Sequence, residues 1–413
     1  MRFFLDNYEK IKQGVLVLLI IVLPFYHALS SILIITAVSL SFLRLCFYKR
    51  SDFVPLDKLS IAVFSYFILE VIGLGYTEKE DFRNGMFNIE KHFGMMAIPL
   101  IFYNFKIEAR FRDRLFSAFI VSCFIATVIC LVANMYLSLS TQDTLFDPWL
   151  FSHARLSGQI EMHPVYMAMY LALSILIMLH HLQENYALLS IAKKTTIIFL
   201  TFFFLGMILL LGARTTTAIL MLIIVIGVVR LAITRKTYKP LMVLAFIPLI
   251  FAGVLFLNPH IQNRFFDVSA SSYDHSSYGG LFARTKIWEP GIEVIKENFW
   301  FGVGTGDDQA ELDKMFVKYN YPEAVRVFNT HDQYLQTLIS IGFIGLLVFL
   351  LLLYLQFKAA FTGKDRLYLY FLILFVAGCV TESMLQRHQG IVFFLLFSFI
   401  FYRSERLNRT ESK

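Results

Sequence analysis

Three side chains in this sequence have types and positions suited to chemistry on a phosphate-bearing substrate. His331 lies where a long polar stretch, residues 258–333, gives way to an apolar one, and Arg284 lies inside that stretch. Arg214 lies between two apolar blocks. An imidazole near neutral pH can take a proton from a hydroxyl, and a guanidinium binds phosphate oxygens as a bidentate fork. Such residues on one face of a membrane would suit a lipid diphosphate headgroup.

The glycines that follow His331 predict how its ring is placed. At about 100° per residue, Gly342 shares one helical face with His331, and Gly345 lies close to that face. Small residues in a membrane helix allow another helix to approach closely. We therefore expect His331 to lie at a membrane surface, above a strip of small residues.

Other polar residues are weaker candidates. His163 precedes Pro164, which is a natural first residue of a membrane helix. We count His163, together with Trp288 of the polar stretch, among the residues expected to contact substrate. Glu70 and Glu382 are isolated near the ends of apolar blocks, so they do not indicate the carboxylate relay of a transporter.

The sequence indicates no metal or other cofactor. Closely spaced His and carboxylate ligands are missing from the polar stretch, and its Gly302–Gly306 turn lacks the lysine of a phosphate-binding loop. The cysteines lie in or at the end of apolar blocks, where small buried side chains are common. They are Cys46, Cys123, Cys130 and Cys379.

The composition predicts an all-α, polytopic integral membrane protein. The 413 residues are 57% hydrophobic and 16% charged, whereas a soluble domain is about half apolar and about a quarter charged. Most apolar blocks are about 17–24 residues long, enough to cross about 30 Å of hydrocarbon. The alternating pattern of an outer-membrane barrel is absent.

The apolar blocks predict about twelve membrane-spanning helices in a single membrane domain, residues 1–413. The predicted spans are residues 14–30, 31–48, 59–75, 93–105, 114–137, 164–182, 194–212, 215–233, 240–257, 334–357, 367–382 and 389–402.

The distribution of basic residues predicts the orientation of these spans. An even number of spans places both termini on one side, and the short loops on that side carry most of the Lys and Arg. Cytoplasmic loops are enriched in these residues. The termini are therefore expected in the cytoplasm, and residues 258–333, between the ninth and tenth spans, form a long periplasmic loop. This orientation explains the net charge of +7, so we infer no nucleic-acid partner.

The periplasmic loop is predicted to contain short helices. Ser269 to Gly280 is rich in Ser, Tyr and Gly and is typical of a flexible segment. A helix is expected from Thr285 to Asn298, with Pro290 at its first turn or at a break. Asp307 or Asp308 can cap a second helix. The apolar faces of both helices should lie on the membrane surface or against the spans.

The motifs together resemble the O-antigen ligase and polymerase family of bacterial cell envelopes, from about Ser157 onward. His331, followed at a fixed interval by Gly342-Phe343-Ile344-Gly345, resembles that family's histidine motif, although Asp332 stands where Asn, Ser or Gln is usual. Arg284-Thr285-Lys286-Ile287-Trp288, running into Phe301-Gly302-Val303-Gly304, resembles a second motif. Arg214 after Leu211-Gly212-Ala213 resembles the arginine between two central spans, with Ala218 where leucine is expected. Glu382 to Gly390 resembles the last outward turn.

This resemblance implies glycan transfer on the periplasmic face of the bacterial inner membrane, from an undecaprenyl diphosphate donor. A ligase passes the glycan to the lipid A core, and a polymerase passes it to another lipid-linked glycan. In an inverting, metal-independent reaction, His331 would act as the general base on the acceptor hydroxyl. Arg214 and Arg284 would bind the diphosphate and neutralise the leaving charge.

The alternatives differ in acceptor or in class. We favour a ligase, with a repeat-unit polymerase second, and a transferase that glycosylates proteins would share the same machinery. A lipid-linked glycan transporter, from another class, should instead carry polar residues at mid-membrane in several spans. The sequence names neither the sugars nor the oligomeric state.

Overall fold

The computed structural model describes residues 2–25, 27–47, 55–142, 144–238, 241–244, 246–266, 281–321 and 324–411. Within these ranges the regular elements are helices, as predicted. The segment expected to be flexible, Ser269 to Gly280, lies outside the described residues.

The helices follow one another as α1 (Arg2–Val22), α2 (His27–Cys46), α3 (Lys58–Leu74), α4 (Phe82–Ile101), α5 (Ala109–Gln142), α6 (His153–Gly158), α7 (Pro164–Glu184), α8 (Ile191–Leu210), α9 (Arg214–Arg235), α10 (Leu241–Leu244), α11 (Phe246–Leu257), α12 (Pro259–Phe266), α13 (Leu281–Glu297), α14 (Asp308–Lys318), α15 (Gln333–Gly363), α16 (Arg366–Cys379), the 3₁₀ turn η3 (Met384–Gln386) and α17 (His388–Glu411).

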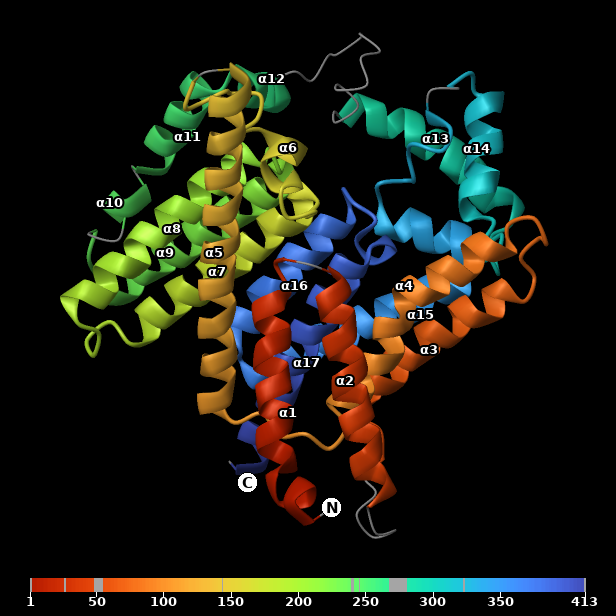
Figure 1. The fold of residues 1–413 in the computed structure, drawn as a ribbon, viewed down its shortest axis with the longest axis horizontal. Coiled ribbons are helices and arrows are strands. Elements are labelled where there is room, and N and C mark those ends of the chain that lie inside the picture. Colours follow the sequence, from red (N-terminus) through yellow and green to blue (C-terminus); the bar gives the residue numbers. More distant parts are fainter. Residues whose placement is uncertain are drawn as a thin grey trace.

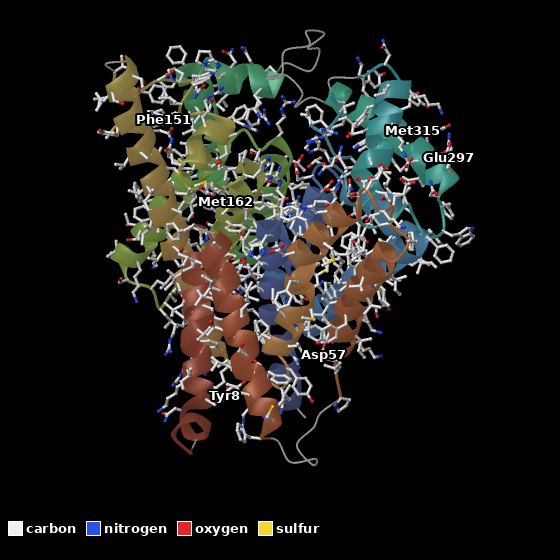
Figure 2. All side chains as sticks on the ribbon, turned by 45° about the vertical axis from the view of Figure 1, so that its right-hand side comes forward. Tyr8, Asp57, Phe151, Met162, Glu297 and Met315 are labelled. Carbon is white, nitrogen blue, oxygen red and sulfur yellow. The ribbon has the colours of Figure 1, made fainter. Side chains whose placement is uncertain are left out.

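The bundle has two distinct ends. Both chain termini lie at one end, and α6, α12, α13 and α14 gather at the other (Figure 1). Figure 2 shows the same division in its side chains, with Tyr8 and Asp57 toward the first end and Phe151 and Met315 toward the second. We call the second the loop end. The described helices of the long loop and the termini therefore lie at opposite ends of the bundle.

Judged by length and composition, fewer of the described helices qualify as membrane spans than the twelve expected. Among the described residues, six helices are long and apolar enough to cross a membrane: α2, α5, α7, α8, α9 and α15. The pair α11 and α12 adds a seventh only if it is one broken span, and it is bent by 114°. The prediction of a polytopic membrane protein is confirmed, whereas the count of about twelve is not. Helices such as α3, with 17 residues, and α16, with 14, are too short to pass this test.

Contacts between aromatic side chains connect the helices that lead to the loop end. Tyr170 of α7 stacks on Phe393 of α17 with ring centroids 4.5 Å apart, and Phe375 of α16 stacks on Phe394 at 3.9 Å. Phe119 of α5 meets Phe397 edge-on at 4.7 Å. Such pairs contribute about 0.5–1.5 kcal/mol each beyond the burial of their surface. They fix α7, α16 and α17 relative to one another, and the polar turns at the loop end of these helices are fixed with them.

Helix α15 is broken, which corrects the prediction that His331 and Gly342 share a helical face. His331 precedes the helix, and the helical dihedral angles fail at Ile341 and at Gly342, where φ is +67°. An added Cβ at Gly342 would lie 2.4 Å from the carbonyl oxygen of Trp300. The residue that approaches Gly342 therefore belongs to the long loop, and not to another helix as the small-residue strip suggested.

The loop segment 299–304 is hydrogen-bonded into this break. The carbonyls of Ile339 and Ser340 accept from the backbone N–H groups of Val303 and Gly304, at 2.8 and 3.0 Å. Phe343 N–H donates to the carbonyl of Phe299 at 2.8 Å. These bonds satisfy backbone groups that the broken helix leaves without partners. The glycine turn is thus a structural joint between the loop and α15.

The same turn is also attached to the hairpin of α3 and α4. Gly306 N–H donates to Thr77 Oγ1 at 3.1 Å, and Thr305 Oγ1 donates to the carbonyl of Glu70 at 2.6 Å. Asn88 Nδ2 donates to the carbonyl of Thr305 at 2.8 Å. The loop is therefore held by two separate parts of the bundle.

The two loop helices exist, with corrected boundaries. Helix α13 begins at Leu281 and continues to Glu297, so Pro290 lies inside it and marks neither a first turn nor a break. Asp307 occupies the N-cap position of α14 but makes no side-chain capping bond there, because its carboxylate accepts from Glu78 N–H. The apolar faces pack on each other and on Ile339 of α15. The expectation that they lie against the spans is confirmed for that contact.

Candidate active site

His331 is held in a strained backbone conformation at the start of α15. Its φ is +45°, a region that non-glycine residues rarely adopt. Its own N–H donates to Asn329 Oδ1 at 2.9 Å, and Asp332 caps α15 by accepting from Leu335 N–H. The carboxylate of Asp332 therefore serves as the N-cap of α15.

The partner of the His331 ring is Glu382, which contradicts the view of that carboxylate as isolated. His331 Nδ1 lies 3.2 Å from Glu382 Oε2, and the two side chains are 29% and 6% exposed. Burial by itself would raise the pKa of Glu382, but the hydrogen bond and charge of His331, aided by His163 and Arg387, leave this pKa lowered. An ionised carboxylate can only accept a hydrogen bond, so Nδ1 carries the proton and Nε2 is left as the basic nitrogen.

The loop around His331 is fixed by its neighbour Thr330. Trp288 Nε1–H donates to the Thr330 carbonyl at 3.0 Å, and Thr330 Oγ1 donates to Gln336 Oε1 at 3.0 Å. Gln336 in turn donates to the buried carboxyl of Asp308 at 2.8 Å. The polar atom of Trp288, which we expected to contact substrate, is thus engaged in holding the histidine loop.

Arg284 lies next to this pair. Its Nη2 donates to the carbonyl of Thr381, the residue before Glu382, at 3.0 Å. Burial lowers the pKa of Arg284, the charge of Glu382 raises it, and the charge of Arg214 lowers it further. Arg284 and Arg214 are therefore close enough for their charges to repel each other.

Arg214 starts α9, directly after a turn that Arg264 stabilises. Gly212 has a φ of +60°, and its carbonyl accepts from Arg264 Nε at 3.2 Å. The positive φ favours glycine at this position, and a Cβ there would lie 2.6 Å from Arg264 Cδ, so a larger residue would displace the Arg264 side chain. Arg264 of α12 also interacts with the charges of Arg214 and Arg284. The site thus contains a third arginine that the sequence interpretation missed.

Two histidines complete the basic cluster. His163, the N-cap of α7, is influenced by Glu382, Arg387, His331 and Arg264, and burial is the main reason that its pKa is lowered to about 4. His153, which has a φ of +47°, has its pKa lowered to about 3, chiefly by burial and then by Arg264. Both rings are neutral at neutral pH. Among the described residues, the buried Nδ1 of His163 has no hydrogen-bond partner.

The structure brings together the sequence-predicted residues His163, Arg214, Arg284 and His331, and it adds His153, Arg264 and Glu382. The resemblance of Glu382–Gly390 to an outward turn was the available signal for Glu382. No local pattern marked Arg264 or His153. Within the described parts of the chain, no group of three or more His, Cys, Asp or Glu side chains is placed to hold a metal ion.

The site is rich in positive charge. Arg264 and Arg284 are partly buried and each is influenced by the charge of Arg214, while Glu382 and Asp332 counter the charge of Arg284. An anion carrying more than one negative charge would interact favourably with these guanidinium groups. Fold and site together define a multi-pass helical membrane protein with a basic, histidine-containing site at its loop end.

The family comparison agrees with this class. Residues 199–350 match the family model described as O-antigen ligase, so the chain carries an O-antigen ligase domain over that range. The matched range contains Arg214, Arg264, Arg284 and His331, and it ends before Glu382. The activity that this match supports is membrane glycan transfer of the O-antigen ligase or polymerase type. No curated protein matches the chain.

Proposed function

We propose that the protein is an O-antigen ligase-like glycosyltransferase that moves a glycan from undecaprenyl diphosphate to the lipid A core, on the periplasmic face of the bacterial inner membrane. The observation that carries this proposal is the His331–Glu382 pair, with Nδ1 and Oε2 3.2 Å apart, next to the arginine cluster. A base oriented by a carboxylate and set beside cations suits attack by a hydroxyl on a phosphate-activated carbon.

In the proposed reaction, Nε2 of His331 takes the proton of the acceptor hydroxyl. The acceptor oxygen then forms a bond to the anomeric carbon on the face opposite the diphosphate. The bond from that carbon to the diphosphate oxygen breaks, and the configuration inverts. Undecaprenyl diphosphate leaves with its bonding electron pair, and Glu382 stabilises the imidazolium formed at His331.

The arginines are proposed to bind the donor and to stabilise the leaving group. Arg214 and Arg284 would bind the diphosphate, and we assign Arg264 to the same anion. Guanidinium groups already fixed by backbone carbonyls, as Arg284 and Arg264 are, need little reorganisation when negative charge develops on the leaving group. Because these cations can neutralise that charge, the reaction is proposed to need no metal ion.

The test is donor binding and glycan transfer by purified variants. His331→Ala should lower turnover about 10²–10⁴-fold and keep donor affinity, since a general base acts after binding. Arg214→Ala, Arg264→Ala and Arg284→Ala should weaken both, because phosphate contacts exist in the ground state and in the transition state. Arg83→Ala removes an exposed arginine of α4 and is the matched control.

Each outcome decides a separate part of the proposal. Wild-type transfer by His331→Ala refutes the general base. Normal donor binding and normal transfer by His331→Ala, Arg284→Ala and Arg214→Ala would mean that the whole site is misplaced and would favour the transporter. Normal binding by Arg264→Ala alone removes only that residue from the site.

The acceptor is decided in cells. A strain that lacks the protein should lose polymer from its lipopolysaccharide while lipid-linked polymer persists. Loss of chain length alone would instead identify a polymerase, which can use the same base and cations with a lipid-linked acceptor.

A further inference from the structure

A cavity lies at the opposite end of the bundle from His331. It has a volume of about 400 Å³, within the range of small-ligand sites, and is lined by residues of α5, α7 and α8 and by the turn before α16. It lies at the end of α7 that carries His181 and Glu184, whereas His163 precedes the other end of that helix. This cavity is therefore separate from the candidate active site.

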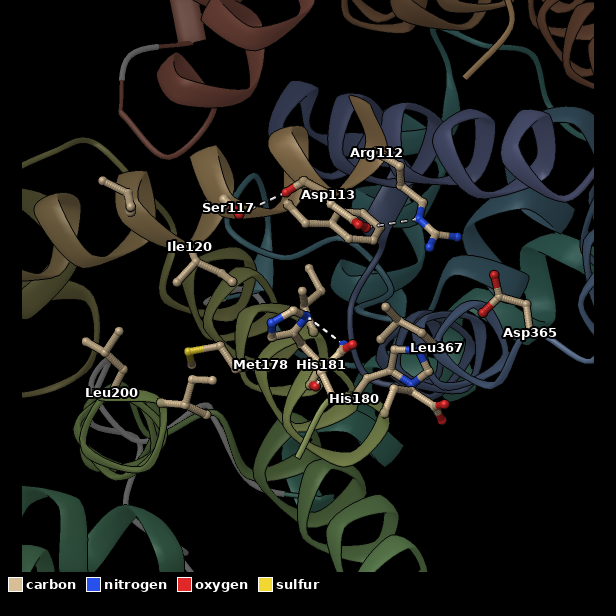
Figure 3. A pocket seen from close by; sticks show the side chains of 16 residues that line it. Arg112, Asp113, Ser117, Ile120, Met178, His180, His181, Leu200, Asp365 and Leu367 are labelled. Carbon is tan, nitrogen blue, oxygen red and sulfur yellow. Dashed lines mark hydrogen bonds and ion pairs between the residues drawn. The ribbon is translucent and has the colours of Figure 1, made fainter. Parts of the chain in front are cut away.

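The cavity has one polar end and one apolar end. Figure 3 shows Arg112, Asp365 and His180 toward one side of the cavity, and Ile120 and Leu200 toward the other. Its floor is α7, where Ile177 and Met178 are buried. Beyond the apolar end, Phe124 of α5 meets Phe203 of α8 with ring centroids 5.6 Å apart, which closes the groove between these two helices.

The depth of the groove matches one leaflet of a bilayer. From Asp113 to Phe124 along α5, a rise of 1.5 Å per residue gives about 17 Å, and half of the hydrocarbon core measures about 15 Å. Both walls, α5 and α8, are candidate membrane spans. Val121 on one wall is 56% exposed, so the groove is open toward the surrounding hydrocarbon. An acyl chain fits such a groove.

The polar end selects among headgroups. Arg112 can bind a phosphate, and its guanidinium is already oriented by Asp113 at 3.6 Å and by Ser404 at 3.4 Å. Glu184 and Asp365 line the same end and can accept from an ammonium group. A headgroup with only negative charge would meet these carboxylates unfavourably. A headgroup that combines a phosphate with a primary amine satisfies both signs of charge.

We propose that this groove binds a zwitterionic phospholipid with a primary-amine headgroup, of the phosphatidylethanolamine type, from the leaflet opposite the active site. The phosphate lies at Arg112, the amine lies toward Glu184 and Asp365, and one acyl chain lies between α5 and α8. The lipid would tie α8, and through it α9 with Arg214, to the aromatic core. The proposal is independent of the reaction at His331.

The test compares lipids bound to the delipidated full-length protein in detergent, measured by native mass spectrometry with added phosphatidylethanolamine or phosphatidylglycerol. The wild-type protein should retain phosphatidylethanolamine in preference. Leu200→Trp, which fills the apolar groove, and Glu184→Gln, which removes a charge at the exposed end of α7, should each lower its affinity roughly tenfold.

Leu222→Trp is the matched control, because it adds the same bulk at an exposed position of α9 away from the groove. Equal retention of both lipids, or unchanged affinity in Glu184→Gln, would overturn the proposal and leave only ordinary boundary lipid. The Glu184 variant keeps the test decisive even if the tryptophan disturbs packing.

Discussion

Replacing Glu382 tests the proposed orientation of His331 most directly. Alanine removes the acceptor of the 3.2 Å bond to Nδ1, and glutamine keeps an acceptor oxygen but removes the charge. Because the Glu382 side chain is only 6% exposed, water cannot replace it effectively. A hydrogen bond to a charged group contributes about 1.5–3 kcal/mol and one between neutral groups about 0.5–1.5 kcal/mol.

These magnitudes predict a graded series. Turnover should fall about 10–150-fold in Glu382→Ala and about 5–15-fold in Glu382→Gln, because each 1.36 kcal/mol is a factor of ten in rate. Glu382→Asp should restore part of the loss, since it keeps the charge. Donor affinity should stay the same or improve, because Glu382 attracts Arg284 and its removal leaves that guanidinium more available to phosphate.

The assay measures kcat for glycan transfer and, separately, the Kd for the lipid-diphosphate donor. Glu311→Ala is the control, since Glu311 forms an ion pair with exposed Lys314 and such surface pairs contribute at most about 1 kcal/mol. If Glu382→Ala turns over within twofold of the wild type while His331→Ala is inactive, Glu382 does not orient the base. An equal loss of kcat and of donor affinity would mean that Glu382 only supports the fold.

Further predictions concern topology, metals and pH. The labelling test starts from a variant without the exposed Cys46. In cells with a permeabilised outer membrane, a cysteine at Asn320 should react with a membrane-impermeant thiol reagent, and a cysteine at Thr362 should not. Labelling at Thr362 alone would reverse the orientation. Transfer should survive excess EDTA, and activity restored by one divalent ion would reveal a missed site. Burial raises the pKa of Asp308 to about 7, so between pH 4 and 7 the folded protein holds a proton that the unfolded chain has lost. Stability should therefore fall as pH rises through that window, by at most about 1.4 kcal/mol per pH unit, and thermal unfolding of Asp308→Asn should lack this component.

Much of the architecture could be predicted because it depends on local composition. Apolar blocks specified helices wherever backbone groups must be satisfied inside a membrane, and each of the predicted spans overlaps a helix in the structure. Six of these helices nevertheless fall short of a span on their own by length or by polarity, and α11 is one of them because it qualifies only together with α12. Helices α3 and α16 are apolar but have only 17 and 14 residues, so the length of the helix as well as its composition decides whether it qualifies as a span.

The site was predictable in part. Arg214, Arg284 and His331 come from different parts of the chain, yet the topology placed them at one end. Glu382 lies 51 residues after His331, and only the packing of α16 against α15 brings it to the ring. The break in α15 was not predicted, because Gly342 was interpreted as a small residue that permits helix packing. In the structure, its positive φ instead ends the helical conformation at that point.

The joint between residues 299–304 and the break in α15 has a consequence for exchanging parts among related enzymes. Gly302 and Gly342 each occupy a position where a Cβ would strike the backbone of the other segment, at 2.4–2.6 Å. Neither segment can therefore change shape alone, although a span and an aqueous loop would ordinarily be treated as separate modules. The two segments could be exchanged only as one cassette that carries the loop helices, the histidine and the first part of α15 together. A hybrid with its crossover between residues 304 and 342 would combine a loop segment from one protein with a helix break from another, and the two backbones would not be complementary.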